Sequence, residues 1–132
     1  MDEMYMREAL FEAQKAYDKE EVPIGAVIVC GGEIVGRGYD TMETDKDPTC
    51  HAEMTAIRNA CKNLDRWRLC GCDLYVTTDP CPMCRGAIEL ARFDHVYVGT
   101  RDGILASECA EIIRKFFKEL RIKDKESAEE KQ

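Results

Sequence analysis

The sequence lacks any apolar run long enough to cross a lipid bilayer, and it does not open on a basic-then-apolar leader. It also has no internal repeat and no linker. Its 132 residues are 45% hydrophobic and 34% charged, a balance typical of one soluble globular domain. We therefore expect a cytoplasmic protein without a membrane partner. One domain should span residues 1–122, and a charged tail over residues 123–132 should fray.

Histidine is scarce and cysteine is abundant, with two and eight copies. Eight cysteines in a secreted protein of this size would suggest disulfide bonds. Here six of the eight follow no framework spacing, and no leader directs the chain to an oxidising compartment. Free thiols, some of them bound to a metal, fit this pattern better.

The net charge of −7 is unevenly distributed. Residues 1–53 carry thirteen acidic and five basic side chains, whereas residues 54–132 carry thirteen acidic and fourteen basic ones. An acidic protein is a poor general binder of nucleic acid, so a basic binding face must come from the later part. The basic residues of the last helix could form this binding face. Alternatively, they could simply be the solvent-exposed face of that helix. They are Arg114, Lys115, Lys118, Arg121, Lys123 and Lys125.

The pattern of apolar residues predicts alternating helices and strands. A helix is expected over residues 4–20, followed by a hairpin that turns at Gly31 and Gly32. After a polar loop at 40–48, Thr49 is a suitable N-cap for the second helix. The remaining predicted elements are strands within 73–78 and 95–99 and helices from residue 79 and from Leu105.

Strands that are joined through helices form parallel pairs in a sheet that helices cover. The third and fourth predicted strands are such a pair. We therefore predict an α/β fold, a three-layer α/β/α sandwich around a mixed sheet of about four to five strands.

Two cysteines, Cys81 and Cys84, have the clearest metal-ligand spacing in the chain. They follow Asp79-Pro80, a natural helix start, and residues three apart on a first turn face the same way. The positive end of the helix favours their thiolates. A redox pair and a chance spacing are the alternatives, but the separate histidine favours a metal.

The third ligand must come from a histidine or from further cysteines. His51 opens a predicted helix as Cys81 does, so the two helix starts can meet at one point. His95 opens a strand and fits a surface or structural role better. The alternative, a structural site of four thiolates, has a short gap between its two pairs. It would use Cys70, Cys72, Cys81 and Cys84.

One histidine and two cysteines leave the fourth tetrahedral position of a zinc ion open, as in catalytic rather than structural sites. Zinc lowers the pKa of water and so provides a hydroxide nucleophile at neutral pH. Glu53 lies two residues after His51, does not share a helix face with it, and is a poor co-ligand. It can still reach the open side of the metal and move protons. The alternative is a solvated glutamate.

His51-x-Glu53 together with Pro80-Cys81-x-x-Cys84 resembles the signature of the cytidine deaminase-like zinc deaminases. Within that superfamily the chain is most similar to bacterial tRNA-specific adenosine deaminases. The resemblance covers residues 1 to about 101 and then the last helix. The similar stretches are MREAL.EAQKAY, EVPIGAVIV, DPTCHAEMTAIRNAC, LYVTTDPCPMC, GAIELAR and GILASECAEIIRKFFKELR.

The resemblance implies a hydrolase in which hydroxide attacks the amidine carbon of a nucleobase and ammonia leaves. It implies one Zn²⁺ per chain, held by His51, Cys81 and Cys84, with Glu53 as the proton shuttle. Members of the family form homodimers and convert adenosine to inosine at the wobble position of the tRNA anticodon loop. The residues that the resemblance places beside the substrate are Ala52, Pro23, Ile24 and Gly25.

Three positions depart from the family pattern. The family has Asn in place of Asp40, at a side chain that touches the target nucleotide. Asn donates and accepts hydrogen bonds, whereas an ionised Asp only accepts, which predicts altered substrate choice or weaker binding. Asp79 replaces a Glu, and Arg85 replaces a small residue. Arg85 is either a phosphate or base contact or a surface arginine.

The largest departure is a missing segment. After the stretch VYVGTRD the family has a loop, a short helix and a further strand, whereas here Asp102 leads directly to Gly103. We therefore expect four strands, with the strand at 95–99 at or near the edge of the sheet. An open edge invites pairing with another chain unless the last helix covers it. Loss of the segment is also expected to open the substrate pocket.

Three functions follow from these residues. The first is deamination of adenosine in tRNA or a related single-stranded nucleic acid. The second is deamination of a free base or nucleoside, such as guanine, cytosine or cytidine, in nucleotide salvage. The third is a binding protein that keeps zinc for folding, but a structural site has no use for Glu53. We take the first as the prediction and the second as its alternative.

Overall fold

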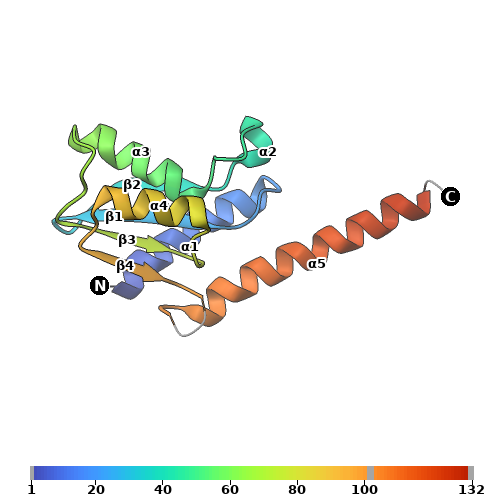
Figure 1. Ribbon diagram of the computed structural model, residues 1–132. Coiled ribbons are helices and arrows are strands. Elements are labelled where there is room, and N and C mark those ends of the chain that lie inside the picture. The colour runs from blue at the N-terminus through green and yellow to red at the C-terminus, as the bar shows by residue number, and fades with distance from the viewer. Residues whose placement is uncertain (1, 101–102, 131–132) are drawn as a thin grey trace.

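The computed structural model describes residues 2–100 and 103–130 (Figure 1). The predicted order of helices and strands is confirmed, with one added turn of helix in the polar loop. Among the described residues, no helix is long and apolar enough to cross a membrane. The elements are α1 (Asp2–Asp18), β1 (Gly25–Cys30), β2 (Glu33–Tyr39), α2 (Met42–Asp45), α3 (Ala52–Leu64), β3 (Cys72–Val76), α4 (Pro82–Ala91), β4 (His95–Val98) and α5 (Ala106–Glu130).

The strands of the described chain form one mixed sheet in the order β2-β1-β3-β4. β1 pairs antiparallel with β2 and with β3, and β3 pairs parallel with β4. The hairpin of β1 and β2 turns at Gly31 and Gly32, whose φ angles of 59° and 81° favour glycine. The predicted parallel pair and the predicted edge position of the last strand are both confirmed.

Side chains of the central strands alternate between the two faces of the sheet. On β1, Ala26 and Ile28 pack in the cluster that includes residues of α3 and α4, whereas Val27 and Val29 pack with residues of α1. This alternation follows from the two-residue period of a strand. Helices therefore cover both faces of the sheet, and the predicted three-layer sandwich is confirmed (Figure 1).

Two glycines of β2 bring α3 close to the sheet. A Cβ atom on Gly36 would lie 2.4 Å from the carbonyl oxygen of Ala56, and one on Gly38 would lie 2.4 Å from that of Ala52. The alanines of α3 that face the sheet, among them Ala60, are fully buried. Small residues on both elements thus fix the start of α3 against β2, and this start carries His51 as its N-cap.

α5 runs beside α1 in the same direction. Arg7 near the start of α1 pairs with Glu108, at nitrogen–oxygen distances of 2.9 and 3.3 Å. Further along α5, Lys123 donates to Glu20, which lies just after the end of α1, at 2.6 Å. The partners on the two helices advance along the chain together, so the helices lie parallel.

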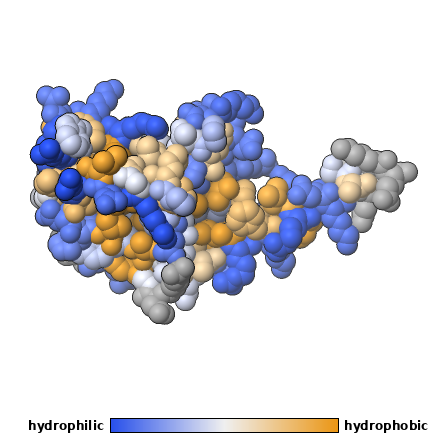
Figure 2. Space-filling model, viewed as in Figure 1, coloured by the Kyte–Doolittle hydropathy of each residue, from blue (hydrophilic) through white to orange (hydrophobic). Residues whose placement is uncertain are grey.

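The last part of α5 extends beyond the body of the protein (Figure 1). We expected residues 123–132 to fray, whereas α5 is one continuous helix to Glu130, and residues 131–132 lie outside the described part. Lysine and glutamate are good helix formers, which accounts for the continuation. Apolar and charged side chains lie next to one another along α5, as Figure 2 shows, and the exposed apolar ones include Phe117, Leu120 and Ile122.

Candidate active site

The site lies where α3 and α4 begin. His51 is the N-cap residue of α3 and Cys81 is the N-cap residue of α4, both with extended backbone angles. Cys84 follows on the first turn of α4, after Pro82 at its first position. The two helix starts meet at one point, as the sequence predicted, because both helices pack on the same face of the sheet.

The cap of α3 differs from the prediction. Thr49 is not the N-cap, since the helix begins at Ala52 and is capped by His51. The backbone N–H and the hydroxyl of Thr49 instead donate to Asp47 Oδ1, at 2.8 and 2.7 Å. Thr49 therefore stabilises the turn that leads into the site, a common use of a hydroxyl residue near an aspartate.

The three predicted metal ligands lie close together. His51 Nδ1 is 3.6 Å from the sulfur of Cys81 and 3.6 Å from that of Cys84. All three ligand atoms lie within 4.8 Å of one another. In a tetrahedral site with Zn–N of about 2.05 Å and Zn–S of about 2.3 Å, nitrogen and sulfur are about 3.6 Å apart. The donor set and its spacing therefore fit zinc.

The other candidate ligands lie elsewhere. Within the described part of the chain, the only metal-sized group of His, Cys, Asp and Glu ligands is His51 with Cys81 and Cys84. Cys72 is at the opposite end of β3 from the strand end that leads to Cys81. His95 is largely exposed and lies 3.0 Å from Asp73 Oδ1. The four-thiolate alternative is therefore wrong, and the geometry agrees with a surface role for His95.

Glu53 is buried on the first turn of α3, with only 3% of its surface exposed. Burial raises its pKa above the ordinary value for a glutamate. Hydrogen bonds to its own backbone and to Cys84, and the charge of His51, oppose this rise. A buried carboxyl beside a metal-ligand group is placed to take up a proton and return it.

The thiol of Cys84 is fully buried. Without a metal, burial and then the charge of Glu53 raise its pKa, which opposes the thiolate that the helix start favours. Zinc binding reverses this balance because coordination deprotonates a thiol. Formation of the thiolate pair is therefore tied to metal binding.

Asp40 is 2% exposed and lies against the start of α3. Its Oδ1 accepts a hydrogen bond from the backbone N–H of Ala52 at 2.7 Å, and its own N–H donates to the carbonyl of Ile24 at 3.2 Å. Burial raises the pKa of this carboxyl to about 7; the bond from Ala52 opposes that rise, and the charges of Glu53 and Glu21 add to it.

The structure brings the predicted substrate-side residues together near Asp40. Pro23 is buried, and Gly25 is joined to Thr77 by two hydrogen bonds of 3.0 and 3.1 Å. Arg85 differs from these, since it is exposed on α4 directly after Cys84.

Two buried residues near the site were missed from the sequence. Thr77 ends the strand pairing next to Gly25, shortly before Asp79-Pro80. Glu21 accepts hydrogen bonds from the backbone N–H groups of Glu43 and Thr44, and so anchors α2. A polar residue directly beside the apolar run from Val22 was the available signal for Glu21.

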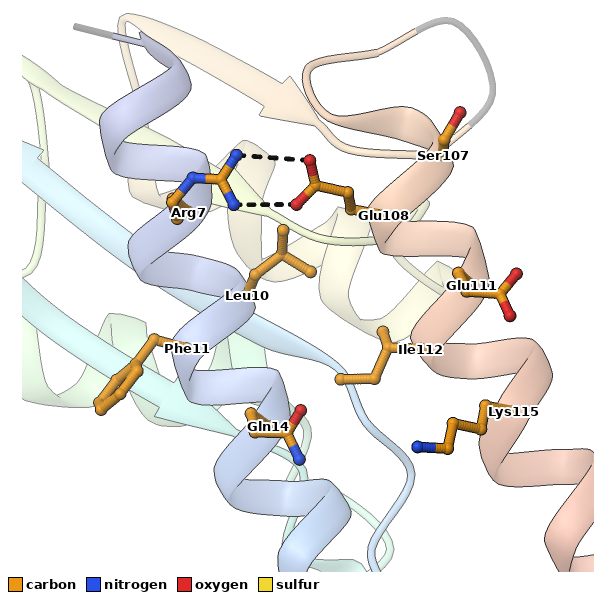
Figure 3. Close-up of a pocket in the computed structure, with 9 residues that line it drawn as sticks. All are labelled: Arg7, Leu10, Phe11, Gln14, Ser107, Glu108, Glu111, Ile112 and Lys115. Atoms are coloured by element: carbon orange, nitrogen blue, oxygen red, sulfur yellow. Dashed lines mark hydrogen bonds and ion pairs between the residues drawn. The ribbon is translucent and has the colours of Figure 1, made fainter.

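A groove of about 680 Å³ lies between α1 and α5 (Figure 3). Leu10 and Ile112 point into it, and Arg7 pairs with Glu108 at one end. None of His51, Cys81, Cys84 or Glu53 lines it. The groove is therefore separate from the group of candidate metal ligands.

Comparison with known proteins agrees with this geometry. Residues 1–100 match the family model of the cytidine and deoxycytidylate deaminase zinc-binding region. The tRNA-specific adenosine deaminase of Bacillus subtilis (strain 168) is 43% identical to the chain, over 94% of this chain and 93% of that protein. That alignment spans 150 positions, 18 more than the chain has residues, so it contains gaps of at least that size in this chain. Gaps in this chain are what a missing segment would produce.

Two solved structures are also similar. One comes from a study of A-to-I editing by tRNA:A34 deaminases at the wobble position. It is 45% identical with a TM-score of 0.70, over 72% of this chain and 73% of that one. The other is a guanine deaminase from Bacillus subtilis, 43% identical with a TM-score of 0.69, over 73% of this chain and 62% of that one. The chain therefore belongs to the cytidine and deoxycytidylate deaminase family and is a zinc-dependent hydrolytic deaminase.

Proposed function

We propose that this protein converts adenosine to inosine at the wobble position of tRNA. Zinc is held by His51, Cys81 and Cys84, one ion per chain. The observation that carries the proposal is the buried Glu53 beside these three ligands, in a chain similar to tRNA-specific adenosine deaminases over nearly its full length. Homodimer formation and a cytoplasmic location belong to the same proposal.

The reaction consumes water and releases ammonia. Zinc supplies water activation at neutral pH. Glu53 accepts a proton from the attacking water and passes protons on to the departing amino group, so that the amidine carbon exchanges nitrogen for oxygen. The buried position of Glu53 excludes competing solvent from this transfer.

The walls of the site hold the base. Ala52 follows His51 directly, and its backbone lies beside the substrate. Asp40, Pro23, Ile24 and Gly25 form the neighbouring wall, joined through the hydrogen bond from Asp40 N–H to Ile24. Arg85, exposed next to the ligands, is placed to contact a phosphate or a flanking base.

Several basic side chains of α5 are engaged within the protein. Arg114 pairs with Glu111, Lys123 pairs with Glu20, and Lys115 lies over the ring of Tyr17. These contacts favour the interpretation that these three basic residues belong to the solvent-exposed face of α5 and do not bind RNA. Lys118, Arg121 and Lys125 are exposed on α5 and remain the basic residues best placed to meet RNA.

Guanine deamination is the second candidate. Its support is the guanine deaminase structure, whose identity to this chain is within two percentage points of that of the tRNA deaminase structure. Asp40 bears on the choice, because an acceptor side chain suits a base that presents N–H groups. The tRNA-specific adenosine deaminase of Bacillus subtilis is 43% identical over 94% of this chain, and this similarity favours the first candidate.

A deamination panel read by mass spectrometry tests the proposal. Zinc-loaded protein is incubated with an anticodon stem-loop carrying adenosine at the wobble position, with single-stranded DNA, and with free adenine, guanine, cytosine and their nucleosides. We expect inosine in the stem-loop and no turnover of the free bases. Turnover of guanine alone would replace the proposal with its alternative. A Glu53→Gln variant serves as the inactive control in every arm.

A further inference from the structure

Two cysteines lie opposite each other on neighbouring strands of the sheet, away from the candidate zinc ligands. Cys30 ends β1 and Cys72 begins β3, and the two are paired directly in the antiparallel ladder. The backbone of Cys72 bonds elsewhere: its N–H donates to Leu69 and its carbonyl accepts from Asp94. The pair is therefore a non-hydrogen-bonded one, the kind in which opposite side chains approach most closely.

This position suits a disulfide. In non-hydrogen-bonded pairs the Cα atoms are about 4.5 Å apart, at the short end of the range that disulfides span. Both sulfurs also lie on one side of the sheet, in the cluster under α3 and α4. A disulfide formed there can be reduced again by exchange with a thiol.

Arg66 joins the two thiols. Its Nη2 lies 3.9 Å from the sulfur of Cys30 and 3.8 Å from the sulfur of Cys72. Its Nη1 donates to the carbonyl groups of Arg68 and Cys70, at 2.9 and 3.0 Å, which fixes the guanidinium in place. A guanidinium fixed beside both sulfurs can stabilise the negative charge that a sulfur carries as it attacks an oxidant.

The two thiols differ in access. Cys30 is partly exposed, whereas Cys72 is fully buried. Burial, with the neighbouring thiol of Cys30, raises the pKa of Cys72 to about 11, and Arg66 opposes this rise. A small oxidant therefore reaches Cys30 first, and Cys72 is the partner within reach.

We propose that Cys30 and Cys72 are a reversible oxidation site, which forms a cross-strand disulfide in response to hydrogen peroxide. The Cys30 thiol loses its proton, its sulfur attacks one peroxide oxygen and the O–O bond breaks, which gives a sulfenic acid and hydroxide. The hydroxide takes up the proton that the thiol lost and becomes water. The sulfur of Cys72 then attacks the sulfenic sulfur, the S–S bond forms, and a second water leaves with the proton of Cys72. Two thiols are oxidised and one peroxide is reduced. Thiol reductants reverse the step.

The site is separate from the zinc ligands. Cys72 begins β3, whereas Cys81 and Cys84 follow its other end. Bridging β1 to β3 at Cys30 links strands that are already paired. The zinc content of the protein is therefore expected to stay unchanged on oxidation.

Peptide mapping tests the proposal on the zinc-loaded full chain. The protein is treated with a small excess of peroxide, its free thiols are blocked with N-ethylmaleimide, and it is digested with trypsin and Asp-N. Cleavage before Asp73 separates residues 69–72 from the zinc ligands. We expect residues 20–37 linked to residues 69–72, with loss of the link after dithiothreitol. Peroxide treatment that leaves both peptides unlinked overturns the proposal.

Matched variants decide which cysteines are joined. Peptide 69–72 carries Cys70 as well as Cys72, so Cys70→Ser is the control and should retain the link. Cys30→Ser should abolish it, and this partly exposed position tolerates serine. If the link persisted in Cys72→Ser and were lost in Cys70→Ser, the disulfide would join Cys30 to Cys70. That result would overturn the proposal. Arg66→Ala should slow formation about three- to tenfold. An unchanged rate of disulfide formation would show that Arg66 plays no part in the reaction.

Discussion

The carboxyl of Asp40 is bound to the first turn of α3, because its Oδ1 accepts the backbone N–H of Ala52 at 2.7 Å. This bond uses an oxygen that an asparagine would also offer through its amide carbonyl. Aspartate and asparagine differ at the other end group of the side chain, which is an oxygen in aspartate and an NH2 in asparagine. Asparagine adds N–H donors toward the site, whereas an ionised aspartate adds only another acceptor.

Asp40→Asn is expected to raise activity on adenosine in the stem-loop. The variant keeps the bond to Ala52 and gains a donor, which is worth about tenfold in kcat/KM if it forms one hydrogen bond of roughly 1.4 kcal/mol to the substrate. Steady-state kinetics on the stem-loop measures the change, with Asp40→Ala as the control that loses both interactions. Equal activities of Asp40→Asn and wild type would remove Asp40 as a determinant for this substrate.

The gain should depend on pH. The pKa of Asp40 is about 7, so below pH 7 the wild-type carboxyl is protonated and donates as asparagine does. Above pH 7 it is ionised and only accepts. The ratio of Asp40→Asn to wild-type activity is therefore expected to rise as pH increases through 7. Using the ratio cancels titrations that both proteins share, and a flat ratio from pH 5.5 to 8.5 would contradict this role.

Glu53→Gln should leave zinc bound and remove catalysis. The amide keeps the volume of the buried side chain but cannot accept and return a proton, so kcat is expected to fall by about 10² to 10⁴. Zinc content by mass spectrometry should stay near one ion per chain. Glu89→Gln, on the exposed side of α4, is the matched control. If Glu53→Gln retained most of the activity, Glu53 would not be the proton carrier.

Cys84→Ala should lose zinc and destabilise the fold. The mutation removes one of three ligands at the junction of α3 and α4, and we expect a loss of about 3 kcal/mol or more in the free energy of unfolding. Removal of zinc from the wild-type protein with a chelator should likewise lower the free energy of unfolding. Cys50→Ala, next to His51 but outside the ligand group, is the control. Full zinc retention in Cys84→Ala would overturn the ligand set.

Gly38→Ala should disturb the site from a distance. The new Cβ would lie 2.4 Å from the Ala52 carbonyl and 2.7 Å from the Ala56 nitrogen, both rigid backbone atoms. The start of α3 must shift, at a cost of about 2–4 kcal/mol and with weaker zinc binding. Urea unfolding and zinc titration measure both effects.

Gly86→Ala is the matched control for that prediction. Gly86 lies on the exposed side of α4, and a Cβ there meets no atom within 4 Å. Alanine should stabilise the helix by about 0.5–1 kcal/mol, because it reduces the freedom of the unfolded chain. Destabilisation of both variants to the same degree would mean that the close approach of β2 and α3 is not the cause.

Local patterns decided much of the fold in advance. Alternation in β1 and the turn at Gly31 and Gly32 predicted the hairpin, and helical periodicity predicted α3 and α4. The errors were also local. α2 forms in a polar loop because Glu21, distant in sequence, accepts its backbone N–H groups. A pattern within a short stretch of sequence cannot indicate such a distant partner. The same local reasoning placed the N-cap of α3 at Thr49, whereas it is His51.

The sequence by itself determined the chemistry. A histidine, two cysteines and a glutamate at these spacings resemble the zinc deaminase signature, which predicts a ligand set and a proton carrier. Only the tertiary structure decided the environment of each group. It buried Asp40 and raised its pKa, brought Cys30 opposite Cys72, and aligned α5 with α1. Burial and cross-strand register depend on residues far apart in the chain, and local sequence does not specify them.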